Sequence, residues 1–344
     1  MEVQPQSRPS VSGNTRVLRI PGGKTKQTLN IGTWNTRSLY EAGKLANTIL
    51  EMKKHNIDIL GVSETWWPDC GEFFSQNTKI YYFGNQSKHH RNGIGILMKK
   101  NIAKFVTGFI STSDRVMMVK INAKPLNINI IQVYAPTADK SEEIESFYAE
   151  LNELMRLTKS HETNIIQGDF NAKVGRGEVQ GVVGQYGLGE RNDKGDRLIQ
   201  FCQEYKLKIS NTLFNLPPRR LYTWKSPSDT PDNIIRNQID FILINDRFCS
   251  SVKKVTTYPG ADVPSDQNLL MAKICIRLAS NRKKKPKLKL NLEKLRKDDI
   301  KCSLKNNRIS NIDSRNPNNI WEQRYMGQRL HLHQKKLLDH IGKK

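Results

Sequence analysis

Short apolar segments recur through the first 280 residues of the chain and are separated by polar stretches that contain Gly and Pro. Each segment is about five to eight residues long, which is the usual length of a strand in a folded core. We therefore predict strands at residues 29–34, 57–62, 93–98, 116–121, 127–134, 164–168, 207–213, 238–244 and 269–276.

Helical periodicity lies between some of these segments. Apolar residues share one face over residues 44–52, where Leu45, Ile49 and Met52 line up, and again over residues 142–157. A third helix is predicted over residues 194–205. Strands outnumber helices and often follow one another directly, which favours stacked mixed sheets covered by helices over a strictly alternating fold.

The apolar pattern predicts one large domain at residues 29–278. Residues 1–28 are rich in Ser, Pro, Gly, Gln and basic side chains, so we expect a disordered basic arm with no signal peptide. Residues 279–344 begin with a basic segment, and we expect a linker followed by a polar tail with helical character near its end. No run approaches the ~18 apolar residues of a membrane span, so no membrane partner is expected.

The chain is strongly basic, with 56 Lys and Arg against 33 Asp and Glu and a formal charge of +23. The excess lies on both sides of residue 280, so the tail alone does not account for it. A basic body favours a polyanionic partner, with nucleic acid first and an acidic membrane surface second, although lysines also serve solubility. The 5 cysteines are scattered without CxxC spacing, which fits reduced thiols in the cytosol or nucleus.

Polar residues interrupt or end several predicted strands. In QGDFNA, Asp169 and Asn171 point the same way while Phe170 points into the core, so a carboxylate and a carboxamide lie together. Glu64 follows a buried strand and could supply a hard oxygen ligand for Mg²⁺. Asp240 lies within apolar QIDFIL, where a carboxylate needs a partner or a metal. Taken singly, each residue has an ordinary alternative as a turn or cap residue.

The order of these segments resembles the endonuclease/exonuclease/phosphatase superfamily over residues 29–278. The resemblance is carried by the motifs WNTRSL, ETWW, VYAPT, GDFNAKVG, RNQIDFILIN and GADVPSDQNLL. More narrowly, these motifs are similar to the endonuclease domains of LINE retrotransposons of the RTE type. The resemblance implies an α/β (α+β) fold, a four-layered sandwich of two packed mixed β-sheets flanked by helices. It also implies a DNA partner and Mg²⁺ or Mn²⁺, without a small-molecule cofactor.

The resemblance also implies roles for individual residues on the metal side of the site. Glu64 would be the main metal ligand, with Asn35 and Asp266 completing the metal site. Tyr134 would contact the scissile phosphate.

The remaining roles concern proton transfer and phosphate binding. Asp169 would orient or deprotonate the attacking water, and Asn171 would hold a phosphate oxygen. Asp240 would orient a catalytic histidine, which the superfamily places directly after Asp266. Here that position is Gln267, and a neutral amide neither accepts nor delivers a proton near neutral pH. Loss of a general acid or base typically lowers the rate by ~10²–10⁴-fold.

Three functions follow from these expectations. The first is a Mg²⁺-dependent DNA endonuclease of retrotransposon origin, and the second is a DNA- or chromatin-binding module that has lost turnover at Gln267. The third is a phosphatase or lipid phosphodiesterase of the same superfamily, which the basic charge disfavours.

A basic and aromatic segment is a candidate nucleic-acid contact. Arg219, Arg220 and Lys225 flank Trp224 there, although a half-buried strand would show the same alternation. The run at residues 282–285 is a candidate nuclear localisation signal or DNA anchor, with a solvated linker as the alternative. We expect a nuclear location, with the cytoplasm as the second choice.

Overall fold

The computed structural model describes residues 16–19, 26–85, 92–138 and 140–279. The chain divides into two units, residues 1–282 and 283–344, and the described residues all belong to the first. The predicted linker and tail, including residues 282–285, therefore lie outside the described residues.

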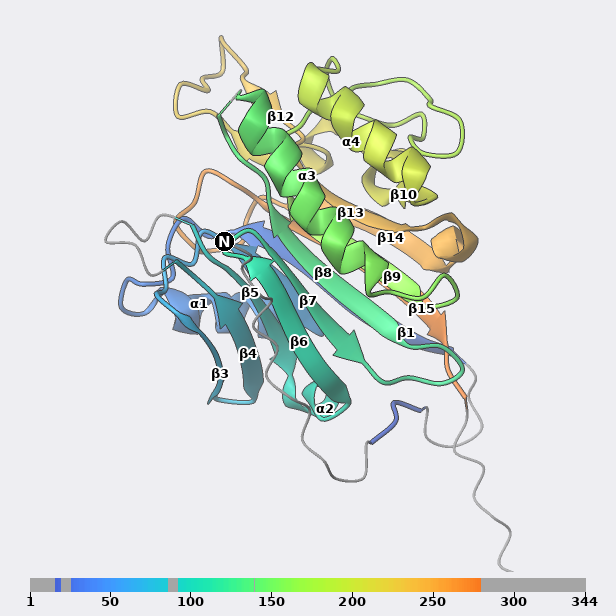
Figure 1. Cartoon of the computed structure of the whole chain (residues 1–344). Coiled ribbons are helices and arrows are strands. Elements are labelled where there is room, and N and C mark those ends of the chain that lie inside the picture. The colour runs from blue at the N-terminus through green and yellow to red at the C-terminus, as the bar shows by residue number, and fades with distance from the viewer. Residues whose placement is uncertain (1–15, 20–25, 86–91, 139, 280–344) are drawn as a thin grey trace, which may run out of the picture. The chain divides into compact units, whose positions relative to one another are not determined.

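The first sheet has seven strands in mixed order (Figure 1). From edge to edge they are β14 (Val252–Tyr258), β15 (Leu269–Arg277), β1 (Lys26–Asn35), β2 (Ile59–Ser63), β5 (Ile94–Lys99), β4 (Thr78–Phe83) and β3 (Cys70–Ser75). The central pair β1 and β2 is parallel, so the carboxyl ends of both strands lie at the same edge of the sheet.

The second sheet has six strands and packs face to face on the first. Its order is β10 (Leu207–Ile209), β13 (Asp240–Asn245), β9 (Thr163–Asp169), β8 (Ile128–Tyr134), β7 (Val116–Ile121) and β6 (Val106–Ser113). β8 and β9 are parallel, and β13 runs antiparallel to β9. A separate ribbon joins β11 (Trp224–Lys225) to β12 (Arg236–Asn237).

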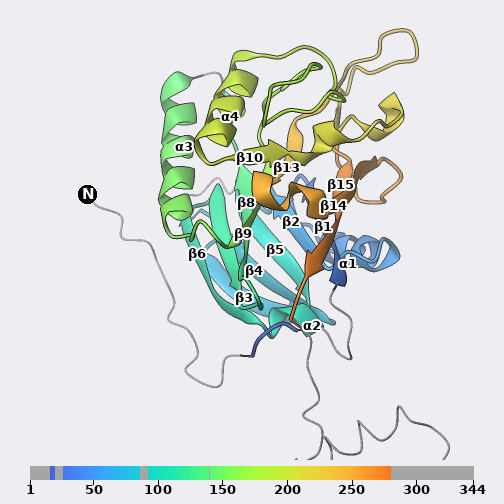
Figure 2. The same ribbon diagram turned by 90° about the vertical axis from the view of Figure 1, so that its right-hand side faces the viewer.

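Helices cover the outer faces of both sheets, as Figure 2 shows with α1 on one side and α3 and α4 on the other. The helices are α1 (Lys44–Lys54), α2 (Lys100–Ala103), α3 (Ser141–Arg156) and α4 (Asp193–Glu204), with short 3₁₀ turns η1 (Ser210–Leu213), η2 (Pro218–Arg220) and η3 (Asp246–Ser251). Apolar side chains fill each interface between layers. The predicted four-layered α/β sandwich is confirmed.

The sequence pattern predicted neither β3, β4, β6 and β14 in the two sheets nor β11 and β12 in the ribbon. β3 is the exposed edge of the first sheet, with Phe73 and Phe74 in exposed positions, and β4 lies between β3 and β5. β6 and β14 mix polar with apolar residues and lie at sheet edges. An edge strand buries less surface than a central one, so its apolar signal is weaker.

Two boundaries lie three or more residues from their predicted positions. The strand predicted at 207–213 ends at Ile209, because Ser210 and Asn211 use their side chains to bond the backbone of β13 and the chain turns into η1. The arm predicted at 1–28 includes ordered residues: β1 begins at Lys26, and Leu18 is buried in a bridge to Ala123. In the described part of the chain, no helix is long and apolar enough to cross a membrane.

Candidate active site

Strand ends from both sheets bring the predicted catalytic residues together. Asn35 ends β1, and Glu64 directly follows β2 in the first sheet. Tyr134 and Asp169 end the parallel strands β8 and β9, where they pair in register, and Asp240 opens β13 opposite Asp169. Because parallel strands finish at one edge, residues far apart in the chain meet at a single end of the sandwich.

Direct hydrogen bonds join the two sheets at this site. Asn35 Nδ2 donates to Glu64 Oε1 at 2.8 Å and to Asp169 Oδ2 at 3.1 Å. The Tyr134 hydroxyl donates to the same Glu64 oxygen at 2.9 Å. Glu64 therefore has one oxygen held by two donors, while the structure gives Oε2 no hydrogen bond within the described residues.

Asp169 is almost fully buried, at 1% exposure. Burial raises the pKa of its carboxyl group to about 6, against the opposing effect of hydrogen bonds from Gln267, Asn35 and the Asn171 backbone. A carboxylate in this range can hold or take up a proton near neutral pH.

The backbone around Asp169 is shaped by its neighbours. Gly168 has φ +148°, and a Cβ there would lie 2.0 Å from the Val133 carbonyl oxygen, so another side chain would displace the parallel strand. Asn171 has φ 47°, which turns its backbone N–H onto Asp169 Oδ1 at 2.9 Å. Its side chain donates to the Ala135 carbonyl at 2.8 Å and lines the pocket.

Tyr134 is buried between charges of opposite sign. Burial and then the negative charge of Glu64 raise the pKa of its hydroxyl group above the ordinary range, so the phenol stays protonated. Arg115 lies against the ring, 5.0 Å from the centroid, and donates to the Tyr134 carbonyl at 3.2 Å. Arg115 was not predicted from the sequence, because its contact with Tyr134 arises from the pairing of β7 with β8.

Gln267 occupies the position expected for histidine and reaches the buried carboxylate. Its Nε2 donates to Asp169 Oδ2 at 2.7 Å, while its Oε1 is buried without a hydrogen-bond partner in the described structure. The loop is held by Trp34 Nε1, which donates to the Gln267 carbonyl at 2.9 Å, and by Ser265 Oγ, which donates to the Asn35 carbonyl at 2.7 Å. The amide is thus fixed in place as a donor.

Asp240 is buried at 1% exposure, and neither of its carboxylate oxygens has a hydrogen-bond partner among the described residues. Burial, followed by the negative charge of Asp169, raises the pKa of Asp240 well above its ordinary value. Asp240 has no histidine to orient, because Gln267 stands at that position. Its surroundings favour the protonated, neutral carboxylic acid.

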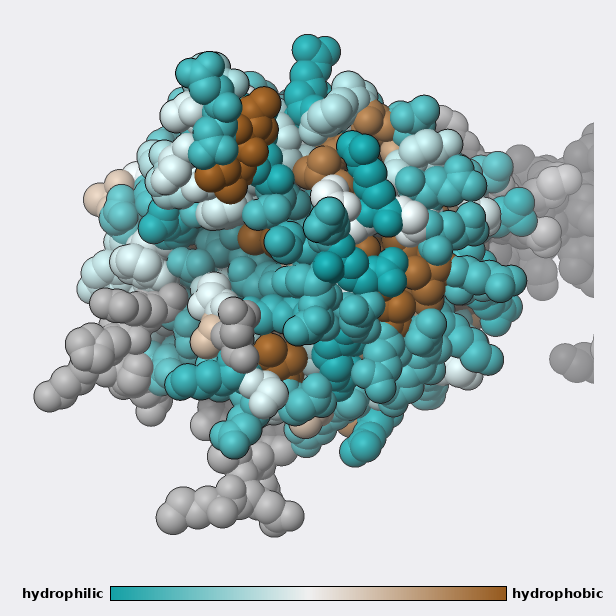
Figure 3. Space-filling view, turned by 90° about the horizontal axis from the view of Figure 1, so that it is seen from above, coloured by the Kyte–Doolittle hydropathy of each residue, from teal (hydrophilic) through white to brown (hydrophobic). Residues whose placement is uncertain are grey.

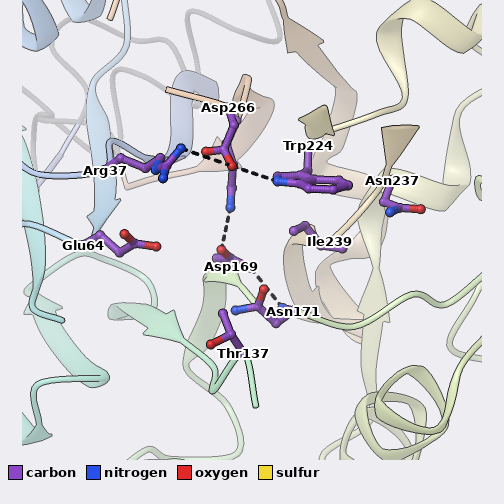
Figure 4. Close-up of a pocket in the computed structure, with 10 residues that line it drawn as sticks. Arg37, Glu64, Thr137, Asp169, Asn171, Trp224, Asn237, Ile239 and Asp266 are labelled. Carbon is purple, nitrogen blue, oxygen red and sulfur yellow. Dashed lines mark hydrogen bonds and ion pairs between the residues drawn. The ribbon is translucent and has the colours of Figure 1, made fainter. Parts of the chain in front are cut away.

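Asp266 is half-buried between a cation and an indole. Trp224 Nε1 donates to its Oδ2 at 2.9 Å, and Arg37 Nη1 lies 3.7 Å from the same oxygen. Figure 4 shows Asp266 between these two side chains and above Asp169, with Glu64 on the side of Arg37. Arg37 was not predicted; its position two residues after Asn35 in WNTR was the available signal.

An open pocket of about 390 Å³ lies at this site (Figure 4), while Asn35, Tyr134 and Asp240 are buried and do not line it. Figure 3 shows that this end of the molecule is largely hydrophilic, with separate small hydrophobic patches. The pocket is lined by Arg37, Glu64, Thr137, Asp169, Asn171, Trp224, Asn237, Ile239, Asp266 and Gln267.

Of the residues predicted to contact nucleic acid, only Trp224 lines the pocket. Trp224 lines the pocket, and Lys225 follows it in the ribbon with its ammonium 3.4 Å from Asp229. Arg219 is exposed on η2 and does not line the pocket. Arg220 also lies outside the lining and donates to the Thr257 carbonyl at 2.9 Å, with its guanidinium 5.6 Å from the Tyr258 ring centroid.

The donor set suits a hard divalent cation. No three His, Cys, Asp or Glu side chains in the described residues converge into a closed metal cluster. Mg²⁺ needs only one or two carboxylates, because water and phosphate oxygens complete its shell. The Glu64 carboxylate lines the pocket with one oxygen without a hydrogen bond, and Asp266 lines the same pocket.

Comparison with known proteins agrees with this geometry. Residues 32–267 match the sequence profile described as the Endonuclease/Exonuclease/phosphatase family. Craniofacial development protein 2 of Bos taurus is 44% identical over 274 residues, 79% of this chain and 45% of that protein. The protein of the same name from Tragulus javanicus is 44% identical over 254 residues, 74% of this chain and 43% of that protein. The chain thus spans less than half the length of these relatives.

Solved structures share the fold at low sequence identity. The endonuclease domain of TRAS1, a telomere-specific non-LTR retrotransposon, superposes with a TM-score of 0.52 at 15% identity, covering 72% of this chain and 98% of that domain. A 3′-5′ exonuclease from Neisseria meningitidis gives a TM-score of 0.55 at 18% identity, covering 72% and 99%.

Proposed function

Because the chain belongs to the endonuclease/exonuclease/phosphatase family, we propose that it is a Mg²⁺-dependent DNA endonuclease that nicks one strand. The observation that carries the proposal is the hydrogen-bonded cluster of Asn35, Glu64, Tyr134 and Asp169, of which Glu64 and Asp169 line the pocket. The match to a retrotransposon polymerase from Drosophila funebris, 26% identical over 152 residues, and the basic body support DNA as substrate.

Glu64, Asn35 and Asp266 would hold the cation, which would neutralise developing negative charge on the phosphate when bound. Asp169 would accept a proton from the attacking water while the oxygen of that water forms its bond to phosphorus. The opposite P–O ester bond breaks, which leaves one phosphomonoester end and one hydroxyl end. The departing oxygen would take its proton from solvent, because the Gln267 amide donates hydrogen bonds but is not an acid near neutral pH.

Tyr134 and Asn171 would bind the phosphate. The Tyr134 hydroxyl stays protonated, so it could turn its single hydrogen from Glu64 Oε1 to a phosphate oxygen. The Asn171 side chain lines the pocket beside Asp169. Its amide would therefore contact a phosphate oxygen close to the attacking water. These groups orient the ester for in-line attack and limit its motion.

One alternative has a specific observation in its favour. Gln267 donates a hydrogen bond to Asp169 but neither accepts nor delivers a proton. The chain would then keep the nuclease fold and bind DNA with little or no hydrolysis. In that case the basic surface would retain salt-sensitive DNA binding while hydrolysis is lost.

A DNA partner in either case implies a nuclear location, which we propose with the cytoplasm as second choice.

The test is conversion of supercoiled plasmid to open circle, with Mg²⁺ and with EDTA. Asp169→Ala is the control for contaminating nuclease. Nicking that needs Mg²⁺ and disappears in Asp169→Ala establishes an endonuclease. Absence of nicking together with salt-sensitive DNA binding establishes the binding module, and absence of both refutes a DNA substrate.

A further inference from the structure

A layer of polar side chains lies between the two sheets, one step deeper than the candidate site. Thr33, Gln132 and Gln167 each lie two positions before a site residue on strands β1, β8 and β9. Side chains two positions apart on a strand share a face, so these three point into the space between the sheets. All three are fully buried.

Strand register places these residues at one level. Gln132 pairs with Gln167 in the parallel pair β8 and β9, and Thr33 pairs with Gly61 in β1 and β2. The next level down is apolar and fully buried; it consists of Ile31, Ile59, Ile130 and Ile165. The polar layer is therefore confined to the level directly beneath the site.

Gly61 makes room for the two amides to reach across the sandwich. A Cβ at this position would lie 1.7 Å from Gln132 Oε1 and 2.5 Å from Gln167 Nε2. Both amide groups of the second sheet therefore contact the backbone of the first sheet at β2.

Hydrogen bonds from Gln132 cross between the sheets. Its Nε2 donates to Ser63 Oγ at 3.0 Å and lies 3.4 Å from Thr33 Oγ1. Ser63 directly precedes Glu64, and Thr33 lies on the strand that ends at Asn35. The amide thus holds both strands of the first sheet that carry metal-side residues.

Fold stability does not account for this layer. Gln132 Oε1 and both polar side-chain atoms of Gln167 are buried without a hydrogen-bond partner in the described structure. Buried polar groups without partners destabilise a fold, and an apolar residue of similar size would remove that penalty.

We propose that Gln132 is a positioning residue that sets the spacing between the two halves of the site, with Gln167 packed beside it against Gly61. The proposal rests on the proposed function. Asn35 and Glu64 come from the first sheet, whereas Tyr134 and Asp169 come from the second. Apolar contacts are non-directional and tolerate small slides, but hydrogen bonds across the layer fix one alignment. The cross-sheet contact of 3.1 Å between Asn35 and Asp169 depends on that alignment.

The test replaces the amides by leucine and measures stability and metal binding separately. Gln132→Leu should leave the urea midpoint unchanged or raised, while the Kd for Mn²⁺, measured by EPR, rises about tenfold or more. Gln167→Leu removes an amide that makes no hydrogen bond in the described structure, so the midpoint should again be unchanged or raised but the Kd should stay the same. Asn129→Leu removes a buried amide from the same strand, in a network with Glu162 and Asn164, and is the matched control. It should lower stability without changing the Kd.

A crystal structure of Gln132→Leu gives a readout independent of catalysis. The Asn35–Asp169 contact should lengthen beyond about 3.5 Å, the limit of a hydrogen bond. Unchanged site contacts with a Kd within twofold of the parent protein would overturn the proposal. If the parent protein binds no Mn²⁺, the metal part of the proposed function fails, and this distance still decides the positioning role.

Gly61 supplies a second, independent variant. Gly61→Ala should lower the urea midpoint, because the methyl group collides with the Gln132 amide. Gly61→Ala combined with Gln132→Ala should recover part of the midpoint, since the methyl group still meets Gln167 Nε2 at 2.5 Å, while Mn²⁺ binding stays weaker than in the parent protein because the Gln132 amide is absent. Recovery of both quantities would show that the amide only fills space.

Discussion

Gln267 Nε2 donates a 2.7 Å hydrogen bond to Asp169 Oδ2, which ties the residue at the histidine position to the predicted general base. The bond favours the ionised form of Asp169, because an amide donor stabilises a carboxylate. It supplies no titratable proton. Under the proposed function, proton transfer is therefore the weakest element of the site.

Restoring the histidine should raise turnover. Gln267→His would add a proton donor and acceptor next to Asp169 and give Asp240 a partner, so nicking should increase at least tenfold. Plasmid nicking under single-turnover conditions measures the change. If the revertant stays as inactive as Asp169→Ala, defects elsewhere in the site limit the reaction.

Nicking should depend on pH through Asp169. The pKa of this group is raised to about 6, so below that pH the carboxyl group is protonated and cannot accept a proton from water. The rate should fall about tenfold per pH unit below the inflection and level off above it. A bound cation favours the carboxylate, so the inflection should move to lower pH as Mg²⁺ is raised. A flat profile between pH 5 and 7, as rough limits, would exclude Asp169 as the base.

Asp240→Asn should stabilise the fold in a pH-dependent way. Burial raises the pKa of Asp240, so the folded state keeps a proton that the unfolded state releases above about pH 4. The parent protein should therefore lose free energy of unfolding relative to Asp240→Asn by about 1.4 kcal/mol per pH unit above that value, until the folded group ionises. Urea unfolding at several pH values measures the difference. Parallel profiles for the two proteins would show that Asp240 does not titrate differently on folding.

Trp224→Phe should weaken metal binding while keeping the ring. The substitution removes the indole N–H that donates to Asp266 at 2.9 Å, and loss of such an outer contact typically lowers metal affinity ~10–100-fold. Trp67→Phe is the control, because its N–H donates to the Leu39 carbonyl at 3.2 Å and Trp67 does not line the pocket. Equal Mn²⁺ affinity in both variants would remove Asp266 from the metal site.

Substitutions of the adjacent Arg219 and Arg220 should have different effects on DNA binding and on stability. Arg219 is exposed, so Arg219→Ala should weaken DNA binding and reduce the salt dependence by about one phosphate contact without changing the urea midpoint. Arg220 donates to Thr257 and lies over Tyr258, so Arg220→Ala should also lower stability. Fluorescence anisotropy with a DNA duplex, over a range of salt concentrations, measures binding. An unchanged salt slope in Arg219→Ala would remove this residue from the DNA interface.

The family and the layered architecture were predictable because their signals are local. Asp169 and Asn171 stand in one motif, and Glu64 follows an apolar strand, so residue type and spacing pointed to the end of a sheet. The strand predictions held best in the sheet centres, where both faces are buried. They failed at edges such as β3, where exposure weakens the pattern.

The contacts between distant segments were decided by tertiary structure alone. The hydrogen bond between Gln267 and Asp169 joins residues 98 positions apart, and the amide layer of Gln132 and Gln167 beneath the site has no distinguishing periodicity. Sequence by itself determined which residue types stand at the strand ends, because alternation and burial act within a few neighbours. The packing of one sheet on the other determined which of them touch, because that depends on register and spacing across the whole sandwich.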